Sequence, residues 1–426
     1  MASLSIERER QAREEVGVTS YSRGVKWFLS AFFVVTVAGG TVWHLALDLV
    51  DTPRPWPRIL DPTRLLPATE EVRAVAAEAG WAAALKAAND RMGTNIADYE
   101  TDLEDGSPVI DALMPTVNAV VTDLLGGSTE SVYRGRDGWW FFRPDIDYVT
   151  GPGFLTPRPR VEGAWDPLPA LDEFHRALNE RKIALIVAPI PVKPSIYPER
   201  FSTRFEGAQT AIQNPSYAQF LARLDDAGIA HVDLGAVLWE ARRTEGSVFL
   251  TTDTHWSPVG VALGAAALGE AIERMGVSWE RLQVSHARTP TEVAGRGDTI
   301  AMLDLTRRAP ETVTLQRISR DGQPWAPQPN AEVLLLGDSF TNIYALPSLG
   351  WGSGAGLAAQ LSAALGRPVD ALAINDNGSY ATRAAVAAGI RRGRDRLSGK
   401  KVVVYAFASR ELAFGDWRTG YTYDEP

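Results

Sequence analysis

From about residue 130 onward, short apolar runs alternate with segments that have helical spacing. The run Val333–Leu336 is entirely apolar, as expected for a strand that is buried on both faces. This alternation predicts an α/β fold with a mostly parallel sheet and helices on both faces. The other strands are expected at 139–142, 183–189, 229–234, 369–374 and 401–407. The helices are expected at 168–182, 215–227, 257–275, 354–365 and 379–391.

The composition of the chain argues against several classes of function. The chain has 426 residues, which is enough for a large core and a second element. Its formal net charge is −9, and we expect no nucleic-acid partner because phosphate binding needs a clustered basic face. The chain has no cysteine, which excludes disulfides, thiolate catalysis and zinc–thiolate sites.

One segment has the length of a membrane span. Trp27–Leu47 contains no charged residue, and about 20 helical residues cross a hydrocarbon core of about 30 Å. Basic residues are more frequent before it than after it, so we expect a single-pass inner-membrane anchor with the rest of the chain outside the cytoplasm, in the periplasm or another extracytoplasmic space. A cleaved signal peptide and a buried core helix are the alternatives.

These features divide the chain into four parts. We expect a cytoplasmic tail at 1–26 and the transmembrane anchor at 27–50. Residues 51–128 begin with a proline-rich stalk and continue into helical segments. The catalytic domain is expected at 129–426.

Two tetrapeptides hold the parts of an activated nucleophile. One reads Asp253-Thr254-His255-Trp256, and the other reads Gly337-Asp338-Ser339-Phe340. A serine needs a base within hydrogen-bond reach, and the base needs a group that orients it. We therefore predict Ser339 as nucleophile, His255 as base and Asp253 as orienting carboxylate. Asp338 is interpreted as a structural partner of its turn.

Three further residues follow predicted strands. The Asn377 amide is a candidate second oxyanion donor, beside the Ser339 backbone N–H, with helix capping as the alternative. Lys193 is a candidate substrate contact or a solvated loop charge, and Arg410 is a candidate site residue or a structural ion-pair partner. Trp139, Trp140 and Trp256 are candidates for stacking on sugars, with core packing as the alternative for the first two. We expect no metal and no cofactor, because a Ser-His-Asp arrangement activates serine without them.

The same residues carry a family resemblance over roughly 130–415. The chain resembles the SGNH-like polysaccharide O-acetyltransferases of the alginate O-acetyltransferase AlgJ/AlgX type. Its Asp-x-His block precedes the serine block, which is similar to the permuted motif order of these enzymes. The matching segments are Gly135–Phe142, Pro189–Lys193, Ile196–Pro198, Asp253–Trp256, Gly337–Phe340, Asn377–Gly378 and Arg410–Leu412.

The resemblance implies O-acetylation of an exported or cell-wall polysaccharide through an acetyl-serine intermediate. It also implies a membrane-bound O-acyltransferase partner that supplies the acetyl group. Two alternatives stay open: a polysaccharide deacetylase or esterase with the same triad, and a non-catalytic, membrane-tethered polysaccharide-binding or assembly subunit.

Overall fold

A computed structural model describes residues 22–51, 61–105, 108–124, 126–156, 166–280, 284–305, 308–375 and 377–424. The chain divides into two compact units, Met1–Thr116 and Val117–Pro426. Most of the predicted cytoplasmic tail, at 1–21, and most of the proline-rich stalk, at 52–60, lie outside the described residues.

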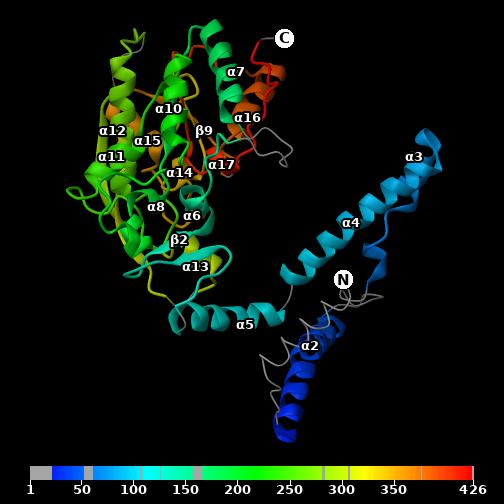
Figure 1. Ribbon diagram of the computed structural model, residues 1–426. Helices are drawn as coiled ribbons and strands as arrows, with labels where there is room; N and C mark the ends of the chain where they lie inside the picture. The colour runs from blue at the N-terminus through cyan, green and yellow to red at the C-terminus, as the bar shows by residue number, and fades with distance from the viewer. Residues whose placement is uncertain are drawn as a thin grey trace, which may run out of the picture. The chain divides into compact units, whose positions relative to one another are not determined.

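The first unit is helical (Figure 1). Its helices are α2 (Arg23–Asp51), α3 (Thr69–Ala79) and α4 (Trp81–Asp105), followed by the start of α5 (Pro108–Ala119). Gly80, with φ of 84°, separates α3 from α4 and lets the chain turn between them. Arg64 pairs with Asp102 and joins the short helix η2 (Pro62–Arg64) to α4.

The predicted membrane anchor at 27–50 falls within α2. Within the described part of the chain, none of the helices has both the length and the apolar character needed to cross a bilayer. The prediction of a transmembrane helix is therefore not supported by the described residues.

The second unit is built on a five-stranded sheet in which every neighbouring pair of strands is parallel. The strand order is β4-β3-β10-β8-β9. The predicted parallel α/β architecture is confirmed, and the observed strands lie close to the predicted ranges. They are β3 (Ala184–Ile190), β4 (Ala230–His231), β8 (Val333–Gly337), β9 (Val369–Ala373) and β10 (Val402–Ala408).

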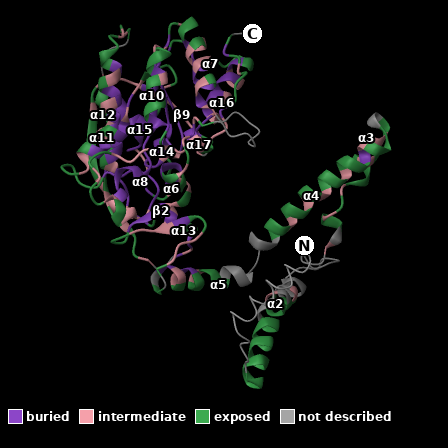
Figure 2. Ribbon diagram, in the orientation of Figure 1, coloured by how far each residue is buried: buried purple, intermediate pink, exposed green. Residues whose placement is uncertain are grey.

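Helices cover both faces of this sheet, because alternate strand residues point to opposite sides. On β8, Val333 and Leu335 belong to one apolar core, whereas Leu334 and Leu336 belong to the other. Figure 1 shows the two helical layers, and Figure 2 shows buried residues concentrated between them. The first core includes residues of α11 (Leu234–Ala241), α12 (Pro258–Arg274) and α15 (Leu357–Leu365). The second includes residues of α7 (Pro167–Glu180), α10 (Tyr217–Asp226), α16 (Ala381–Arg391) and α17 (Glu411–Phe414).

Two small antiparallel sheets complete the unit. β1 (Val132–Arg134) pairs with β2 (Trp140–Phe142), so the predicted aromatic strand forms a hairpin beside the main sheet. A longer hairpin joins β5 (His286–Gly295) to β6 (Glu311–Arg320), and β7 (Gln323–Pro324) extends it. Sequence analysis missed β5 and β6, because polar residues separate their apolar residues and neither strand contains an apolar run.

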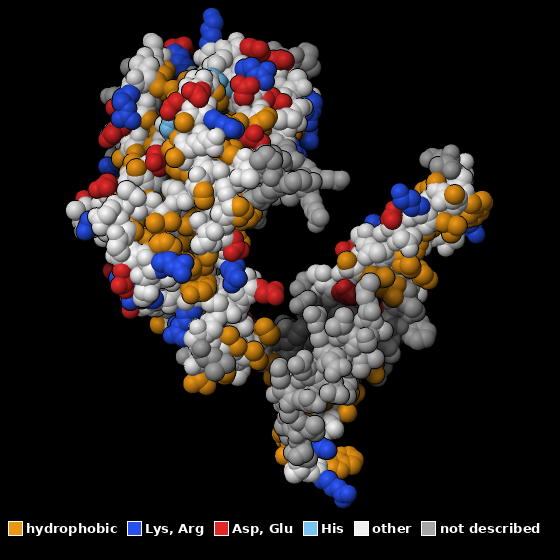
Figure 3. Space-filling model, in the orientation of Figure 1, with side chains coloured by type: hydrophobic (Ala, Val, Ile, Leu, Met, Phe, Trp, Pro, Cys, Tyr) orange, Lys and Arg blue, Asp and Glu red, His pale blue; other side chains and the backbone are white. Residues whose placement is uncertain are grey.

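Short helices and turns connect these elements. They are the π-helical turn η3 (Val120–Leu124), α6 (Arg143–Thr150), α8 (Lys193–Ile196), α9 (Pro198–Phe201), η4 (Thr203–Phe205), α13 (Asp298–Met302), α14 (Ser339–Asn342) and η5 (Pro347–Leu349). Acidic and basic side chains are interspersed on the face of the second unit drawn in Figure 3.

Parallel pairing determines where the predicted site residues lie. Ser339 follows β8, Asn377 follows β9 and Arg410 follows β10. Because these strands are adjacent and parallel, their carboxyl ends meet at one edge of the sheet, where ligands bind in open α/β folds.

A buried ion pair ties the edge strand β9 to the start of β10. The Asp370 carboxylate lies 3.1 Å from Lys400 Nζ, and neither side chain is exposed. We expect Asp370→Ala to lower the free energy of unfolding by about 3 kcal/mol, because it removes the carboxylate that pairs with both the buried Lys400 ammonium and Arg396. Urea denaturation measures this. The control is Asp172→Ala, which removes the exposed Asp172–Arg176 pair and should cost less than about 0.5 kcal/mol. Equal losses in the two variants would contradict the assignment.

Candidate active site

The turn that carries His255 is held from two sides. The backbone amides of Thr251 and Thr252 donate to the Glu311 carboxylate at the start of β6, each at 3.0 Å. Gly297 approaches from the other side with φ of 75°, and a Cβ there would lie 2.0 Å from the Thr252 carbonyl oxygen. Only glycine fits this close approach, which brings the start of α13 against the turn.

The turn that carries Ser339 is held by Asp338. One Asp338 oxygen accepts a hydrogen bond from the Phe340 amide at 2.9 Å, and the other accepts from the Ala408 amide of β10 at 2.7 Å. This confirms the interpretation of Asp338 as a structural residue. Gly337 is required for the same turn, since a Cβ there would lie 2.0 Å from Thr341 Oγ1.

The two turns bring three predicted side chains into one hydrogen-bonded row. Ser339 Oγ lies 2.9 Å from His255 Nε2, and His255 Nδ1 lies 2.7 Å from Asp253 Oδ1. The Asp253 carboxylate is buried, whereas Ser339 is partly exposed. This is the geometry that a serine nucleophile, its base and an orienting carboxylate require.

Aromatic side chains lock the two turns together. Trp256 Nε1 donates to the Phe340 carbonyl at 2.9 Å, and the Tyr344 hydroxyl donates to the Trp256 carbonyl at 2.8 Å. Trp351 Nε1 donates to Asp253 Oδ2 at 2.8 Å. Trp256 is fully buried, as Trp139 and Trp140 nearly are. None of the three is available for stacking on a sugar, so that expectation is wrong for Trp256.

The electrostatic interactions between His255 and Asp253 favour the charged form of both side chains. Burial opposes the charge on Asp253, but the His255 ring and its hydrogen bonds lower the pKa of Asp253 to about 2. Burial also opposes a charge on His255, yet the adjacent Asp253 and the nearby Asp298 raise the pKa of His255 above its usual value. The arrangement therefore stabilises the imidazolium that forms when a serine proton is taken up.

Asp298, the first residue of α13, is a neighbour of His255 that sequence analysis missed. Its Oδ2 lies 3.6 Å from His255 Nδ1, and its Oδ1 accepts from the Thr254 amide at 2.7 Å. Burial, together with the nearby Asp253 charge, raises the pKa of Asp298 to about 6. The only sequence signal was a Gly-Asp pair before a short helix, which is too common to indicate a site.

A cleft of about 560 Å³ opens onto the row. His255, Ser339 and Asp298 line the cleft. Of the other predicted site residues, Asn377 and Arg410 also line it. The other lining residues are Phe142, Pro144, Asp147, Thr254, Met302, Asp338, Leu349, Asn375, Gly378, Glu411 and Phe414.

Asn377 and Arg410 occupy the cleft in different ways. Asn377 is exposed, has φ of 51° and precedes Tyr380, the residue at the N-cap of α16, so the helix-capping alternative is not observed. Arg410 donates to Asp145 at 2.9 Å, and its guanidinium lies 5.3 Å and 5.6 Å from the ring centroids of Phe142 and Phe340. Arg410 therefore combines the predicted structural ion pair with a place on the cleft wall.

Lys193 does not reach the cleft. It is fully buried, and its Nζ donates to the Trp140 carbonyl at 2.6 Å and to the Thr251 carbonyl at 3.3 Å. Burial lowers the pKa of Lys193 to about 8, against the opposing effect of nearby carboxylates such as Asp298. The predicted substrate contact is therefore not supported, and neither is the solvated alternative. Instead, Lys193 supports the turn that carries His255 through its hydrogen bond to the Thr251 carbonyl.

Comparison with known proteins identifies the family. A family model described as "SGNH hydrolase-like domain, acetyltransferase AlgX" matches residues 132–408, which include both turns. The chain belongs to this family.

Curated relatives of this family member carry one name. "Probable alginate O-acetylase AlgJ" of Pseudomonas aeruginosa is 32% identical over 215 residues, which cover 49% of this chain and 52% of the relative. The protein of the same name from Azotobacter vinelandii is 34% identical over 182 residues, covering 43% of this chain and 44% of the relative. The chain thus spans about half the length of the curated relatives it matches.

Solved structures agree on the fold. The O-acetyltransferase domain of Pseudomonas putida AlgJ matches with a TM-score of 0.50 and 22% identity, covering 67% of this chain and 93% of that one. Pseudomonas aeruginosa AlgX matches with a TM-score of 0.51 and 17% identity, covering 68% of this chain and 63% of that one. At these identities the likeness concerns the fold alone.

Asp253, His255 and Asp298 form a candidate metal site, because they place possible ligand atoms within 4.8 Å of one another. The Asp253 oxygens, however, already accept four hydrogen bonds. Oδ1 accepts from the His255 amide at 3.0 Å and from the His255 ring, and Oδ2 accepts from the Asp298 amide at 3.0 Å and from Trp351. A carboxylate offers about four lone-pair positions, so this donor set does not fit a metal.

We therefore expect the melting temperature of the full chain to be unchanged by excess EDTA and by added Zn²⁺ or Mn²⁺, since a ligand stabilises only a fold that binds it. Differential scanning calorimetry measures this. A rise in melting temperature with either ion that disappears in Asp298→Asn would show that the cluster binds metal.

Proposed function

We propose that this protein is an O-acetyltransferase that acts on an exported or cell-wall polysaccharide. One observation carries the proposal: the continuous hydrogen-bonded row from Ser339 Oγ through His255 to Asp253 at the wall of an open cleft. Family membership and the acetylase name of the curated relatives support acetyl as the group that is transferred.

In the first half-reaction, Ser339 Oγ attacks the carbonyl carbon of an acetyl donor. The Ser339 hydroxyl proton passes to His255 Nε2, 2.9 Å away, and the imidazolium is stabilised by Asp253. The donor's leaving group then departs and takes the proton from His255. The product is an acetyl ester on Ser339, with His255 neutral again.

In the second half-reaction, a sugar hydroxyl attacks the acetyl-serine carbonyl. Its proton passes to His255 Nε2, and Ser339 Oγ leaves and takes that proton back. The acetyl group ends on the sugar oxygen. The same base therefore serves both steps, and each step passes through an imidazolium.

Each half-reaction also develops negative charge on the acetyl oxygen. We assign the stabilising donors to the Ser339 backbone N–H and the Asn377 side-chain amide, which reaches the same cleft from the end of β9. Arg410 adds a positive charge to the cleft wall, balanced by the buried Asp145.

The source of the acetyl group is proposed from the family resemblance. A membrane-bound O-acyltransferase is proposed as the partner that supplies the acetyl group, and an exported polysaccharide is the acceptor.

The nucleophile is tested by substitution and trapping. We expect Ser339→Ala and His255→Ala each to lower transfer from an acetyl ester on the order of 10⁴-fold, with little further loss in the double variant, because the residues act as a unit. In a variant slow at the second step, the peptide containing Ser339 should gain about 42 Da by mass spectrometry, because an acetyl group replaces the hydroxyl hydrogen. The control is Ser353→Ala, which lies outside the cleft lining and should keep full activity.

The acceptor separates the remaining alternatives. With sugar oligomers present, including alginate oligomers because the relatives carry that name, acetylated oligomer is expected to form at the expense of free acetate. Release of acetate alone, unchanged by any oligomer, would indicate an esterase. Full activity of Ser339→Ala would contradict the serine mechanism, and a wild-type chain that binds oligomers without any turnover would indicate a binding subunit.

The predicted location, with the second unit outside the cytoplasm, rests on the uncharged run at 27–47 and the basic residues before it. A reporter that works only outside the cytoplasm should therefore be active when fused after residue 426. The control is a reporter that works only in the cytoplasm, fused at the same position. Activity of that control reporter alone would contradict the location.

A further inference from the structure

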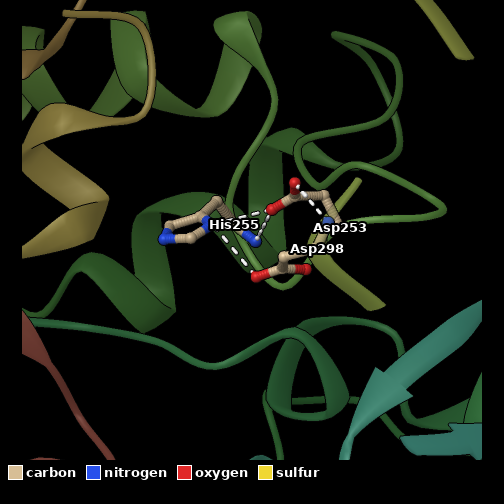
Figure 4. Close-up of side chains that lie close together, drawn as sticks. All are labelled: Asp253, His255 and Asp298. Carbon is tan, nitrogen blue, oxygen red and sulfur yellow. Dashed lines mark hydrogen bonds and ion pairs between the residues drawn. The ribbon is translucent and has the colours of Figure 1, made fainter. Parts of the chain in front are cut away.

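His255 has two carboxylates beside the same ring nitrogen. Asp253 Oδ1 lies 2.7 Å and Asp298 Oδ2 lies 3.6 Å from His255 Nδ1. Figure 4 shows both carboxylates on one side of the imidazole ring, with the other ring nitrogen pointing away from them. At 3.6 Å the second contact is an interaction between charges rather than a hydrogen bond.

Asp298 is fastened to the same turn at both its side chain and its backbone. Its Oδ1 accepts from the Thr254 amide at 2.7 Å, and its own amide donates to Asp253 Oδ2 at 3.0 Å. Asp253, Thr254 and Asp298 thus form one hydrogen-bonded unit around His255. The close approach of Gly297 to Thr252 allows this contact.

The two carboxylates differ in access to solvent. The Asp253 side chain is 1% exposed, whereas the Asp298 side chain is 29% exposed and lines the cleft. Asp253 is therefore sealed from the substrate side, and Asp298 faces both the imidazole and the cleft.

Other charged groups lie near His255 and Asp298, but none of those named below makes a contact with His255 like that of Asp298. The buried Lys193 lies behind the turn, and Glu311 accepts the amides of Thr251 and Thr252. Arg410 is held by Asp145, and its charge lowers the pKa of His255. Asp145 and Asp338 also interact electrostatically with His255, but after Asp253 the largest contribution that raises the pKa of His255 comes from Asp298.

We propose that Asp298 is a second carboxylate for His255, a positioning residue that helps Asp253 to orient the imidazole and stabilises its protonated form. The proposal rests on the proposed function, because an imidazolium forms in each half-reaction. When a sugar fills the cleft and displaces water, the attraction between Asp298 and the imidazolium should strengthen.

The decisive variant is Asp298→Asn. The amide oxygen of asparagine can still accept from the Thr254 N–H, so the substitution removes the charge and keeps the main contact. Removing a negative charge lowers the pKa of His255, and His255 is active when neutral. The acidic limb of the kcat/KM profile should therefore move to lower pH by at least about one unit, as expected for a charge within 4–6 Å. We expect kcat/KM at the plateau to fall about 10-fold.

Two further variants separate a charge effect from a structural one. Asp298→Glu keeps the charge and should restore most of the wild-type pH profile. Asp304→Asn makes the same chemical change just past the end of α13, at a residue outside the cleft lining, and should leave both the profile and the plateau unchanged.

A readout independent of turnover completes the test. In the full chain with labelled histidine, the pKa of His255 can be followed by NMR, with its signal assigned by its loss in His255→Gln. We expect this pKa to fall in Asp298→Asn and not in Asp304→Asn. An unchanged pKa and an unchanged pH profile in Asp298→Asn would overturn the proposal, even if stability falls. If acetyl transfer is absent altogether, the proposed function fails, while the NMR titration still decides the role of Asp298.

Discussion

The hydrogen bonds of one buried carboxylate fix the place of the proposed nucleophile. Asp338 accepts from the amide that follows Ser339 and from the amide of Ala408 at the end of β10. The serine turn is thereby tied to the neighbouring strand as well as to its own. With Ser339 held, the Trp256–Phe340 hydrogen bond sets the distance to the histidine turn. The cleft and the row depend on this pair of connections.

Much of this arrangement could be predicted from the sequence, and the reason is local. Short apolar runs bounded by turn residues, such as Val333–Leu336, are typical of strands buried on both faces, so the parallel strands were predicted close to their observed ranges. Ser339, His255 and Asp253 stand in short motifs whose spacing reflects tight turns. The rule that strand ends collect at one edge of a parallel sheet placed Ser339 at that edge, whereas its pairing with His255 and Asp253 was predicted from the chemistry that a serine nucleophile needs.

What the sequence did not reveal depends on contacts between distant segments. The β5–β6 hairpin has its apolar residues scattered among polar ones, so it lacks the apolar run of a buried strand. Lys193 looked accessible because it follows a strand, but the aromatic side chains of the β1–β2 hairpin and the histidine turn enclose it. Asp298 is ordinary in its local sequence, and its significance comes from a turn more than 40 residues earlier. Each of these outcomes required knowledge of tertiary packing.

The strand order has a consequence for how the chain is made. β10 lies in the middle of the sheet, between β3 and β8, yet it is the last strand in the sequence. During synthesis, β3 and β8 cannot acquire their shared neighbour until residues 402–408 have emerged, and pairing across such long separations is slow. The core, and with it the serine turn that Ala408 holds, therefore closes only after β10 has been synthesised. Until then the apolar strand edges of β3 and β8 that β10 will cover stay open, so the incomplete sheet is prone to aggregation and proteolysis.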